Sequence, residues 1–83
     1  MIRLSVVIPA YNEEATIIEV LTEVRKQKIE GVEVEIVVID DCSVDETRAL
    51  VESHPELHDH FVSLPKNLGK GGAVQVGLRN ATG

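Results

Sequence analysis

The apolar run from Val34 to Ile39 constrains the fold of this chain more than any other feature. It is the most apolar run of the chain, broken once by Glu35, and is suited to a buried strand. A second run spans Leu4 to Ile8, and its near-continuous apolar character predicts a strand buried on both faces of a parallel sheet. A shorter run spans Phe61 to Leu64. Because a segment with helical periodicity follows each run, the sequence predicts three strand-helix units in a three-layer α/β fold.

The first helix is expected between Pro9, which ends the first strand, and Gly31, which closes the helix. Asn12 is suited to cap its N-terminus. The acidic residues Glu13 and Glu14 would stabilise the first turn through the helix dipole. The sheet-facing side consists of residues at helical spacing, namely Ile17, Val20, Leu21 and Val24.

Two further helices are predicted. The segment from Ser43 to Glu46 has the Ser-x-x-Glu form of a capping box, which predicts a second helix running to about Ser53 before Pro55 stops it. A loop then enters a third, glycine-weakened helix over Gly69 to Ala81, for which Gly83 would suit the C-terminal cap.

Length and composition limit the classes of function. A chain of 83 residues makes one small domain of marginal stability, and it contains no internal repeat or linker. The 14 acidic against 8 basic residues give a net charge of -6, which argues against binding to nucleic-acid phosphates. The single Cys42 excludes an internal disulfide and favours a reducing, cytoplasmic setting. The apolar run before Pro9 is too short for a signal sequence or a membrane span.

Polar side chains follow the first two predicted strands. Tyr11 and Glu13 come after the first strand, and the pair Asp40 and Asp41 comes after the second. The crevice outside the carboxyl ends of parallel strands is where open α/β sheets bind ligands, so a nucleotide site is the first candidate. Two adjacent carboxylates repel each other and are an inefficient choice for a turn or cap alone, which favours a binding role for them.

The glycine-rich segment from Asn67 to Ala73 does not match a known phosphate-binding motif. A Walker loop needs Ser or Thr after its Lys and a glycine earlier, whereas Gly71 follows Lys70 and Leu64 holds the earlier position. A dinucleotide fingerprint would place glycines after the first strand, where none occurs. Two interpretations stay open: Lys70 contacts a phosphate, or the glycines only let the third helix pack closely on the sheet.

Three segments, Val6 to Glu14, Val38 to Thr47 and Asn67 to Ala73, resemble in residues, order and spacing the N-terminal half of inverting family 2 glycosyltransferases. The resemblance covers essentially the whole chain, and the third segment is most similar to polyprenyl-phosphate and dolichyl-phosphate sugar synthases. It implies the Rossmann-like βαβαβα half of a GT-A fold, with parallel strands in the order 3-2-1. It also implies a UDP- or GDP-sugar donor, hexosyl transfer with polyprenyl phosphate as a candidate acceptor, and a divalent Mg or Mn ion.

The resemblance implies roles for individual residues. Pro9, Tyr11 and Glu13 would line the nucleoside pocket, and the pair of aspartates would contact the base, with Asp41 the more direct contact of the two. The full set of implied nucleotide-binding residues is Pro9, Ala10, Tyr11, Glu13, Ile39, Asp40, Asp41 and Lys70. A carboxylate can accept hydrogen bonds from the N–H groups of uracil or guanine, and an aromatic ring can cover the base or ribose.

The chain departs from the family in three respects. Cys42 and Glu46 stand where the family usually has glycine, although Cys is small and Glu46 completes the expected capping box, so we expect the site to survive. After Gly83 the family continues into a strand with an Asp-x-Asp motif that holds the metal. The catalytic base, the acceptor site and any segment at the membrane also follow there. Residues 1–83 are therefore expected to bind the nucleotide without catalysing transfer, and to leave the strand from Leu4 to Ile8 as an unpaired edge that self-associates.

Alternatives from other classes remain at this level. A receiver domain also has an acidic pair after an apolar strand, but it would need that pair after its first strand and a phosphorylatable aspartate after its third. A noncatalytic nucleotide-binding or assembly module is a second alternative. The histidines His54, His58 and His60 with Asp59 invite a metal site, but Pro55 interrupts any helical spacing, so a solvated loop is expected there. No histidine neighbours Cys42 in sequence, so its thiol is expected to be inert.

Overall fold

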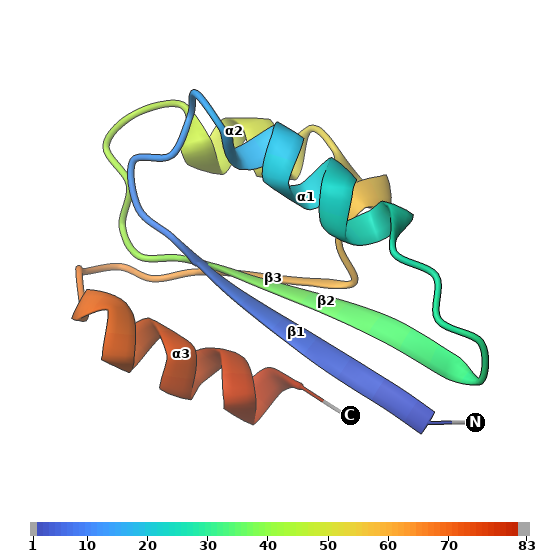
Figure 1. The fold of residues 1–83 in the computed structure, drawn as a ribbon. Coiled ribbons are helices and arrows are strands. Elements are labelled where there is room, and N and C mark those ends of the chain that lie inside the picture. The colour runs from blue at the N-terminus through green and yellow to red at the C-terminus, as the bar shows by residue number, and fades with distance from the viewer. Residues whose placement is uncertain (1, 82–83) are drawn as a thin grey trace.

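The computed structural model of the chain describes residues 2–81, except for the side chain of Lys70. Within this part the elements are β1 (Ile2–Ala10), α1 (Ile17–Lys26), β2 (Val32–Asp40), α2 (Thr47–Glu52), the 3-10 helix η1 (Pro55–Leu57), β3 (His60–Ser63) and α3 (Gly69–Asn80). β2 pairs in parallel with both β1 and β3, which confirms the predicted order 3-2-1. α1 and α2 cover one face of the sheet and α3 covers the other, as Figure 1 shows, which confirms the three-layer fold.

β2 forms the centre of the core because apolar residues occupy both of its faces. Ile36 and Val38 pack on the side of α1 and α2, while Val37 and Ile39 pack on the side of α3. All four side chains are fully buried. The continuous apolar run in the sequence therefore reflects two helical layers that each need an apolar face to pack against.

β1 is longer and more exposed than the sequence predicted. It includes Pro9 in the ladder opposite Ile39 instead of ending there. The expectation of burial on both faces is wrong, since Ile2 is 69% and Leu4 47% exposed. Among the described residues β1 pairs only with β2, so its outer side has no strand beside it and can accommodate a proline.

α1 begins four residues later than its sequence signals suggested. Asn12 is not the cap, because the helix starts at Ile17 and Thr16 precedes it without a side-chain capping bond. Glu13 and Glu14 consequently lie in the connection before the helix and not in its first turn. Gly31 does not close the helix either.

α1 also ends earlier than predicted, and most of its predicted sheet-facing side chains pack in the core. The helix ends at Lys26, and Gly31 adopts a φ of 77° in the turn that leads into β2. Of the predicted face, Ile17 and Leu21 are buried and Val24 packs against the same cluster, whereas Val20 is 43% exposed.

The later elements also differ from the sequence prediction at their N-terminal ends. Ser43 does not begin a capping box: α2 starts at Thr47 and has no side-chain cap of that kind. β3 covers His60–Ser63 and so begins one residue before the predicted strand, and α3 begins at Gly69, so that only Asn67 and Leu68 of the glycine-rich segment precede the helix. Gly83, the predicted cap, lies outside the described residues. No helix among residues 2–81 is long and apolar enough to cross a bilayer.

Candidate functional site

The carboxyl ends of the three strands lie level with one another. The register places Ala10 beside Asp40 and Asp40 beside Ser63. Beyond the strands, the N–H of Asp41 donates to the carbonyl of Ala10 at 2.8 Å and the N–H of Leu64 donates to the carbonyl of Asp40 at 2.9 Å. The loops that leave β1, β2 and β3 therefore open onto one common edge of the sheet.

A pocket of about 320 Å³ lies at this edge. It is lined by Pro9, Ala10, Tyr11, Glu13, Asp41, Asn67 and Gly69. The first five of these residues belong to the set predicted from the sequence: Pro9 and Ala10 end β1, Tyr11 and Glu13 follow in the next loop, and Asp41 follows β2. A small site with an exposed aromatic ring and two carboxylates is suited to an organic ligand with N–H and O–H donors.

The two adjacent aspartates occupy different environments. Asp40 is only 1% exposed, and its Oδ1 has no hydrogen-bond partner among the described residues. Asp41 lines the pocket, and its Oδ1 accepts the N–H of Leu68 at 2.7 Å. Asp40 and the equally buried Ile39 therefore lie in the core below the pocket. Asp41 is the aspartate that a ligand in the pocket would reach.

The start of α3 forms one wall of the pocket. Asn67 accepts the N–H of Gly69 at 2.8 Å and donates its side-chain amide to the carbonyl of Asp41 at 3.4 Å. Gly69 adopts a φ of 77°, which glycine tolerates without strain. The N-terminus of a helix at a pocket favours anions through its free N–H groups and dipole. The side chain of Lys70, the predicted phosphate contact, lies outside the description.

Asn67 and Gly69 were not among the site residues predicted from the sequence. Both stand in the glycine-rich segment already singled out there, and an Asn two residues before a glycine is a signal for a turn held by the Asn side chain. That signal identifies the turn, but the pocket depends on where the third strand places it. The sequence does not show that the carboxyl ends of the three strands lie side by side, and this register is what brings the turn to the pocket.

The loops after β1 and β2 are joined by hydrogen bonds between them. The N–H of Asn12 donates to Ser43 Oγ, and Asn12 Oδ1 accepts the N–H of Val44, both at 2.9 Å. The N–H of Glu13 donates to Thr47 Oγ1 at 2.7 Å. The residues expected to cap helices locally therefore connect two loops about thirty positions apart in the sequence.

Two residues in these loops adopt left-handed backbone conformations. Asn12 has a φ of 51° and Cys42 a φ of 62°. Asn tolerates this region, but Cys pays a steric penalty that glycine would not. Cys42, whose Sγ lies 3.7 Å from the carbonyl oxygen of Pro65, thus keeps the backbone that glycine would favour at this position.

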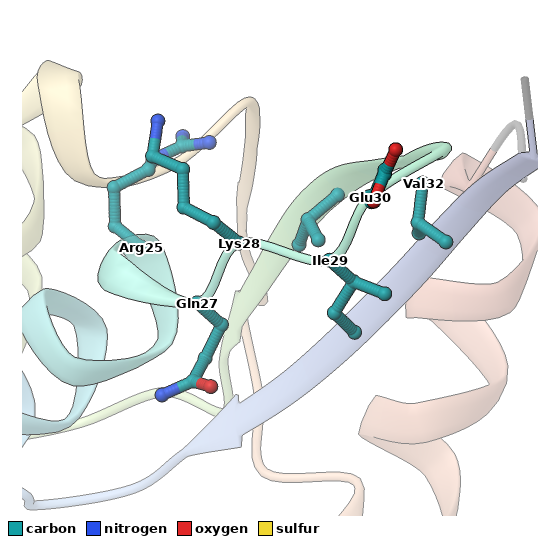
Figure 2. Close-up of a pocket in the computed structure, with 7 residues that line it drawn as sticks. Arg25, Gln27, Lys28, Ile29, Glu30 and Val32 are labelled. Carbon is teal, nitrogen blue, oxygen red and sulfur yellow. The ribbon is translucent and has the colours of Figure 1, made fainter.

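A larger pocket, of about 410 Å³, lies at the opposite end of the sheet, where β2 begins (Figure 2). It is lined by Arg25, Gln27, Lys28, Ile29, Glu30, Val32 and Val34. None of these residues belongs to the predicted site, and no loop from a strand's carboxyl end reaches it. We therefore assign the functional site by convergence of polar groups from several strand ends and not by volume.

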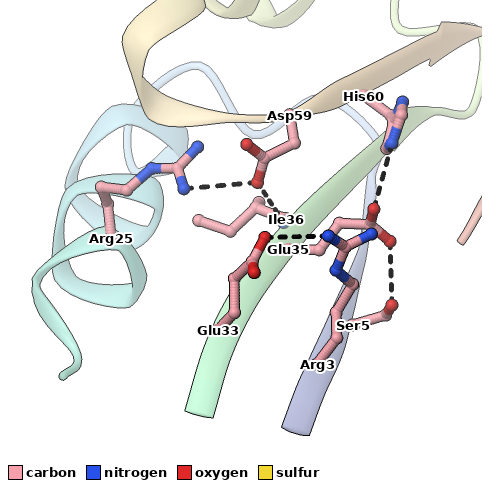
Figure 3. A network of polar contacts seen from close by, with 8 residues as sticks. All are labelled: Arg3, Ser5, Arg25, Glu33, Glu35, Ile36, Asp59 and His60. Atoms are coloured by element: carbon pink, nitrogen blue, oxygen red, sulfur yellow. Dashed lines mark hydrogen bonds and ion pairs between the residues drawn. The ribbon is translucent and has the colours of Figure 1, made fainter. Parts of the chain in front are cut away.

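The segment that contains His54, His58 and His60 forms side-chain contacts with β2 near its end. The expected solvated loop is wrong for His60, which begins β3 and whose Nε2 lies 3.2 Å from Glu35 Oε2 (Figure 3). Asp59 is exposed and outside the strand, and its Oδ2 accepts the N–H of Ile36 at 2.7 Å. Among the described residues no group of three or more His, Cys, Asp or Glu side chains is arranged to hold a metal ion.

The parallel sheet with a polar pocket at its carboxyl edge places the chain among the open α/β proteins, which bind ligands at this edge. The family model described as Glycosyl transferase family 2 matches residues 5–83. The chain therefore belongs to glycosyl transferase family 2. This membership excludes the receiver-domain alternative, whose acidic pair would in addition have to follow β1 and not β2.

Curated relatives agree with this assignment. The chain is 43% identical over 77 residues to the succinoglycan biosynthesis protein ExoO of Rhizobium meliloti, covering 93% of this chain and 22% of ExoO. It is 34% identical over 90 residues to the dolichyl-phosphate beta-glucosyltransferase ALG5A of Trichomonas vaginalis, covering 99% and 28%. The chain thus spans less than a third of the length of these relatives.

Solved structures confirm the GT-A fold. The S. aureus TarS 1-349 structure in complex with UDP-GlcNAc matches with a TM-score of 0.84 and 38% identity, over 100% of this chain and 24% of that one. The mannosyltransferase PcManGT from Pyrobaculum calidifontis, in complex with GDP-Man and Mn2+, matches with a TM-score of 0.78 and 35% identity, over 94% and 24%. The described strands and helices therefore form the N-terminal, Rossmann-like part of a GT-A fold.

Proposed function

We propose that the pocket at the carboxyl edge binds the nucleoside of a UDP- or GDP-sugar donor. The observation that carries this proposal is the position of Asp41. Its Oδ1 is held by Leu68, while its Oδ2 has no hydrogen-bond partner among the described residues, and the side chain lines the pocket. A carboxylate fixed in this way can accept the N–H donors of uracil or guanine.

The other pocket residues are assigned roles around this contact. Tyr11 is 45% exposed and can cover one face of the base or ribose. Glu13 offers a second carboxylate for ribose hydroxyls, and Pro9 and Ala10 form the floor. The diphosphate would approach the N-terminus of α3, where Lys70 and the first N–H groups of the helix favour negative charge. Asp40 and Ile39 support the site from below.

The reaction we propose for the whole protein is inverting transfer of a hexosyl group. TarS is described with UDP-GlcNAc and PcManGT with GDP-Man, which supports a nucleotide-sugar donor. The relationship to a dolichyl-phosphate glucosyltransferase supports a polyprenyl phosphate as acceptor. When bound, a divalent metal would neutralise the donor diphosphate. PcManGT is described with Mn2+, which supports such an ion.

Calorimetry with UDP and GDP tests the nucleotide proposal. The wild-type chain should bind one of the two diphosphates with micromolar affinity, and Asp41→Ala should abolish that binding. Glu33→Ala is the matched control, because it removes an exposed carboxylate at the far end of β2 that pairs with Arg3 on the surface. Absence of binding by the folded wild-type chain would overturn the proposal, as would unchanged binding by Asp41→Ala.

A transfer assay separates the enzyme from the alternative of a noncatalytic nucleotide-binding module. We expect a polypeptide of residues 1–83 to bind nucleotide without transferring sugar, and the protein carrying the rest of a GT-A domain to transfer it. Binding without transfer in both would favour the noncatalytic module. The cytoplasmic setting, with peripheral membrane contact in the larger protein, is likewise a proposal that cell fractionation tests.

A further inference from the structure

Hydrogen bonds connect two loops at the pocket. The first loop comprises residues 11–16 and supplies Tyr11 and Glu13 to the pocket. The second loop comprises residues 41–46 and supplies Asp41. Neither loop is regular secondary structure, so the geometry of the pocket depends on what fixes the loops relative to each other.

Thr47, the first residue of α2, bonds to both loops. Its side chain is fully buried, and a buried hydroxyl is normally hydrogen-bonded. Oγ1 accepts the N–H of Glu13 at 2.7 Å and donates its own hydrogen to Asp45 Oδ1 at 2.5 Å. Both the donor and the acceptor capacity of this hydroxyl are therefore used, and one of the two bonds reaches the first loop.

Asp45 extends the same connection. Its Oδ1 also accepts the N–H of Thr47 at 2.9 Å, and its Oδ2 accepts the N–H of Glu14 at 3.3 Å. Burial alone would raise the pKa of this carboxyl, but the hydrogen bonds from Thr47 and from the Glu14 backbone lower it below its ordinary value. Asp45 is consequently charged at neutral pH, and the charged form is the one that accepts these bonds.

We propose that Thr47 and Asp45 are positioning residues for the nucleoside pocket, whose hydrogen bonds to the N–H groups of Glu13 and Glu14 hold the first loop in its ligand-ready geometry. This inference rests on the proposed nucleoside site. Neither residue lines the pocket, so each acts through the loop that carries Tyr11 and Glu13.

The conformation of the first loop explains why it needs such a restraint. Asn12 lies between Tyr11 and Glu13 and has a φ of 51°, a conformation that a free loop leaves easily. Five hydrogen bonds between this loop and the segment formed by the second loop and α2 oppose this. Ser43 and Val44 bond to Asn12, Thr47 bonds to Glu13, and Asp45 and Glu46 bond to Glu14. A ligand that contacts Tyr11 or Glu13 then pays less to order them on binding.

The first test removes the hydroxyl of Thr47. Thr47→Val keeps the shape of the side chain but deletes the acceptor for the N–H of Glu13, so we expect UDP or GDP affinity to fall about tenfold. Thr47→Ser retains the hydroxyl and should restore the affinity. Thr22→Val is the matched control, since the Thr22 hydroxyl donates only to Ile18 within α1, and it should bind as the wild type does.

The second measurement follows the loop directly. Hydrogen exchange at the amide of Glu13 should become faster in Thr47→Val and return to the wild-type rate in Thr47→Ser, both without ligand. A Thr47→Val variant that keeps wild-type affinity and wild-type exchange at Glu13 overturns the inference. A lower affinity that Thr47→Ser does not restore also overturns it, because a purely steric effect would then be responsible.

A second variant covers the case in which Thr47→Val does not fold. Asp45→Asn changes a half-buried side chain and weakens acceptance of the N–H of Glu14, so affinity should fall and exchange at Glu14 should rise. Unchanged affinity in folded Asp45→Asn overturns the inference. Failure of the proposed function is recognised separately, because the folded wild-type chain would then bind neither diphosphate.

Discussion

Gly77 of α3 lies so close to Val7 of β1 that a Cβ atom at position 77 would stand 2.3 Å from Val7 Cγ1 and 3.2 Å from Ile39 Cγ1. The absence of a side chain at this position is what lets α3 approach the sheet. The glycine-rich character of α3 therefore has a packing reason in its second half, in addition to the pocket at its start. This relationship gives a direct test of the layer formed by α3.

We expect Gly77→Ala to destabilise the protein. Overpacking of a core contact costs about 1–3 kcal/mol, and at this distance the upper part of that range exceeds the ~1 kcal/mol that alanine gains in helix propensity. Gly71→Ala in the same helix is the control, because nothing lies within 4 Å of its added Cβ, and it should be stabilising by about 0.5–1 kcal/mol. Urea unfolding measures both. Equal effects of the two substitutions would contradict this account.

The left-handed backbone at Cys42 predicts how substitutions there behave. Cys42→Gly should leave stability unchanged or raise it, because relief of about 1–2 kcal/mol of steric cost offsets the backbone entropy of glycine. Cys42→Val should lower stability by about 1 kcal/mol or more, since a β-branched residue is strongly disfavoured at positive φ. Thermal unfolding of the two variants checks the difference. A valine variant as stable as the glycine variant would show that the conformation is not retained.

His58 predicts a pH dependence of stability. Burial first, and then the charge of Arg25, lower the pKa of His58 below its ordinary 6.5, and its Nδ1 is buried without a partner among the described residues. The unfolded chain therefore binds the proton more readily than the folded chain. Between the lowered pKa and 6.5 the free energy of unfolding should rise with pH, and it should fall as the pH drops through that window.

Chemical denaturation across this window measures the effect. His58→Leu keeps an apolar contact with Phe61, whose ring centroid lies 5.7 Å from that of His58, but it has no proton to bind. Its free energy of unfolding should vary less between pH 6.5 and lower values than that of the wild type. A wild-type slope retained in full by the variant would assign the dependence to another group.

The open side of β1 predicts self-association of a polypeptide of residues 1–83. Strand edges with unpaired N–H and C=O groups add further strands, and charged side chains on the edge strand prevent this. Leu4→Lys should therefore yield monomers in light scattering where the wild type forms dimers or larger species. Leu78→Lys, which changes a 62% exposed leucine on α3, should not have that effect. A monodisperse wild-type monomer at high concentration would be the contrary result.

The sequence predicted the parts of this fold that depend on local apolar patterns. β2 and the three layers follow from apolar runs separated by helical periods, and the pocket residues Tyr11, Glu13 and Asp41 follow from polar positions after two strands. The order 3-2-1 and the pocket residues Pro9 and Ala10 came from the family resemblance. The exposure of β1 could not be predicted in the same way. It depends on which strands lie beside β1, and an apolar run carries no information about its neighbours.

The sequence-based predictions were wrong where side chains that favour helix N-caps instead form hydrogen bonds to another loop. Asn12 and Ser43 each have the residue type and spacing of an N-cap, yet they bond across 31 or 32 positions of the chain. A local pattern does not distinguish a hydrogen bond to the next turn from one to a loop that folding brings alongside. Asn67 was not predicted as a pocket residue for a related reason. Its side chain holds a turn that reaches the pocket only because β2 and β3 are aligned.

The hydrogen bonds between residues 11–16 and residues 41–47 have a consequence for engineering donor specificity within the family. Exchanging either loop alone for that of a relative would bring together N–H groups and acceptors that were not selected as partners. A chimaera intended to accept a different nucleotide should therefore inherit both segments from one parent, even though only a few of their side chains would touch the base. The unit of exchange at this site is a pair of loops.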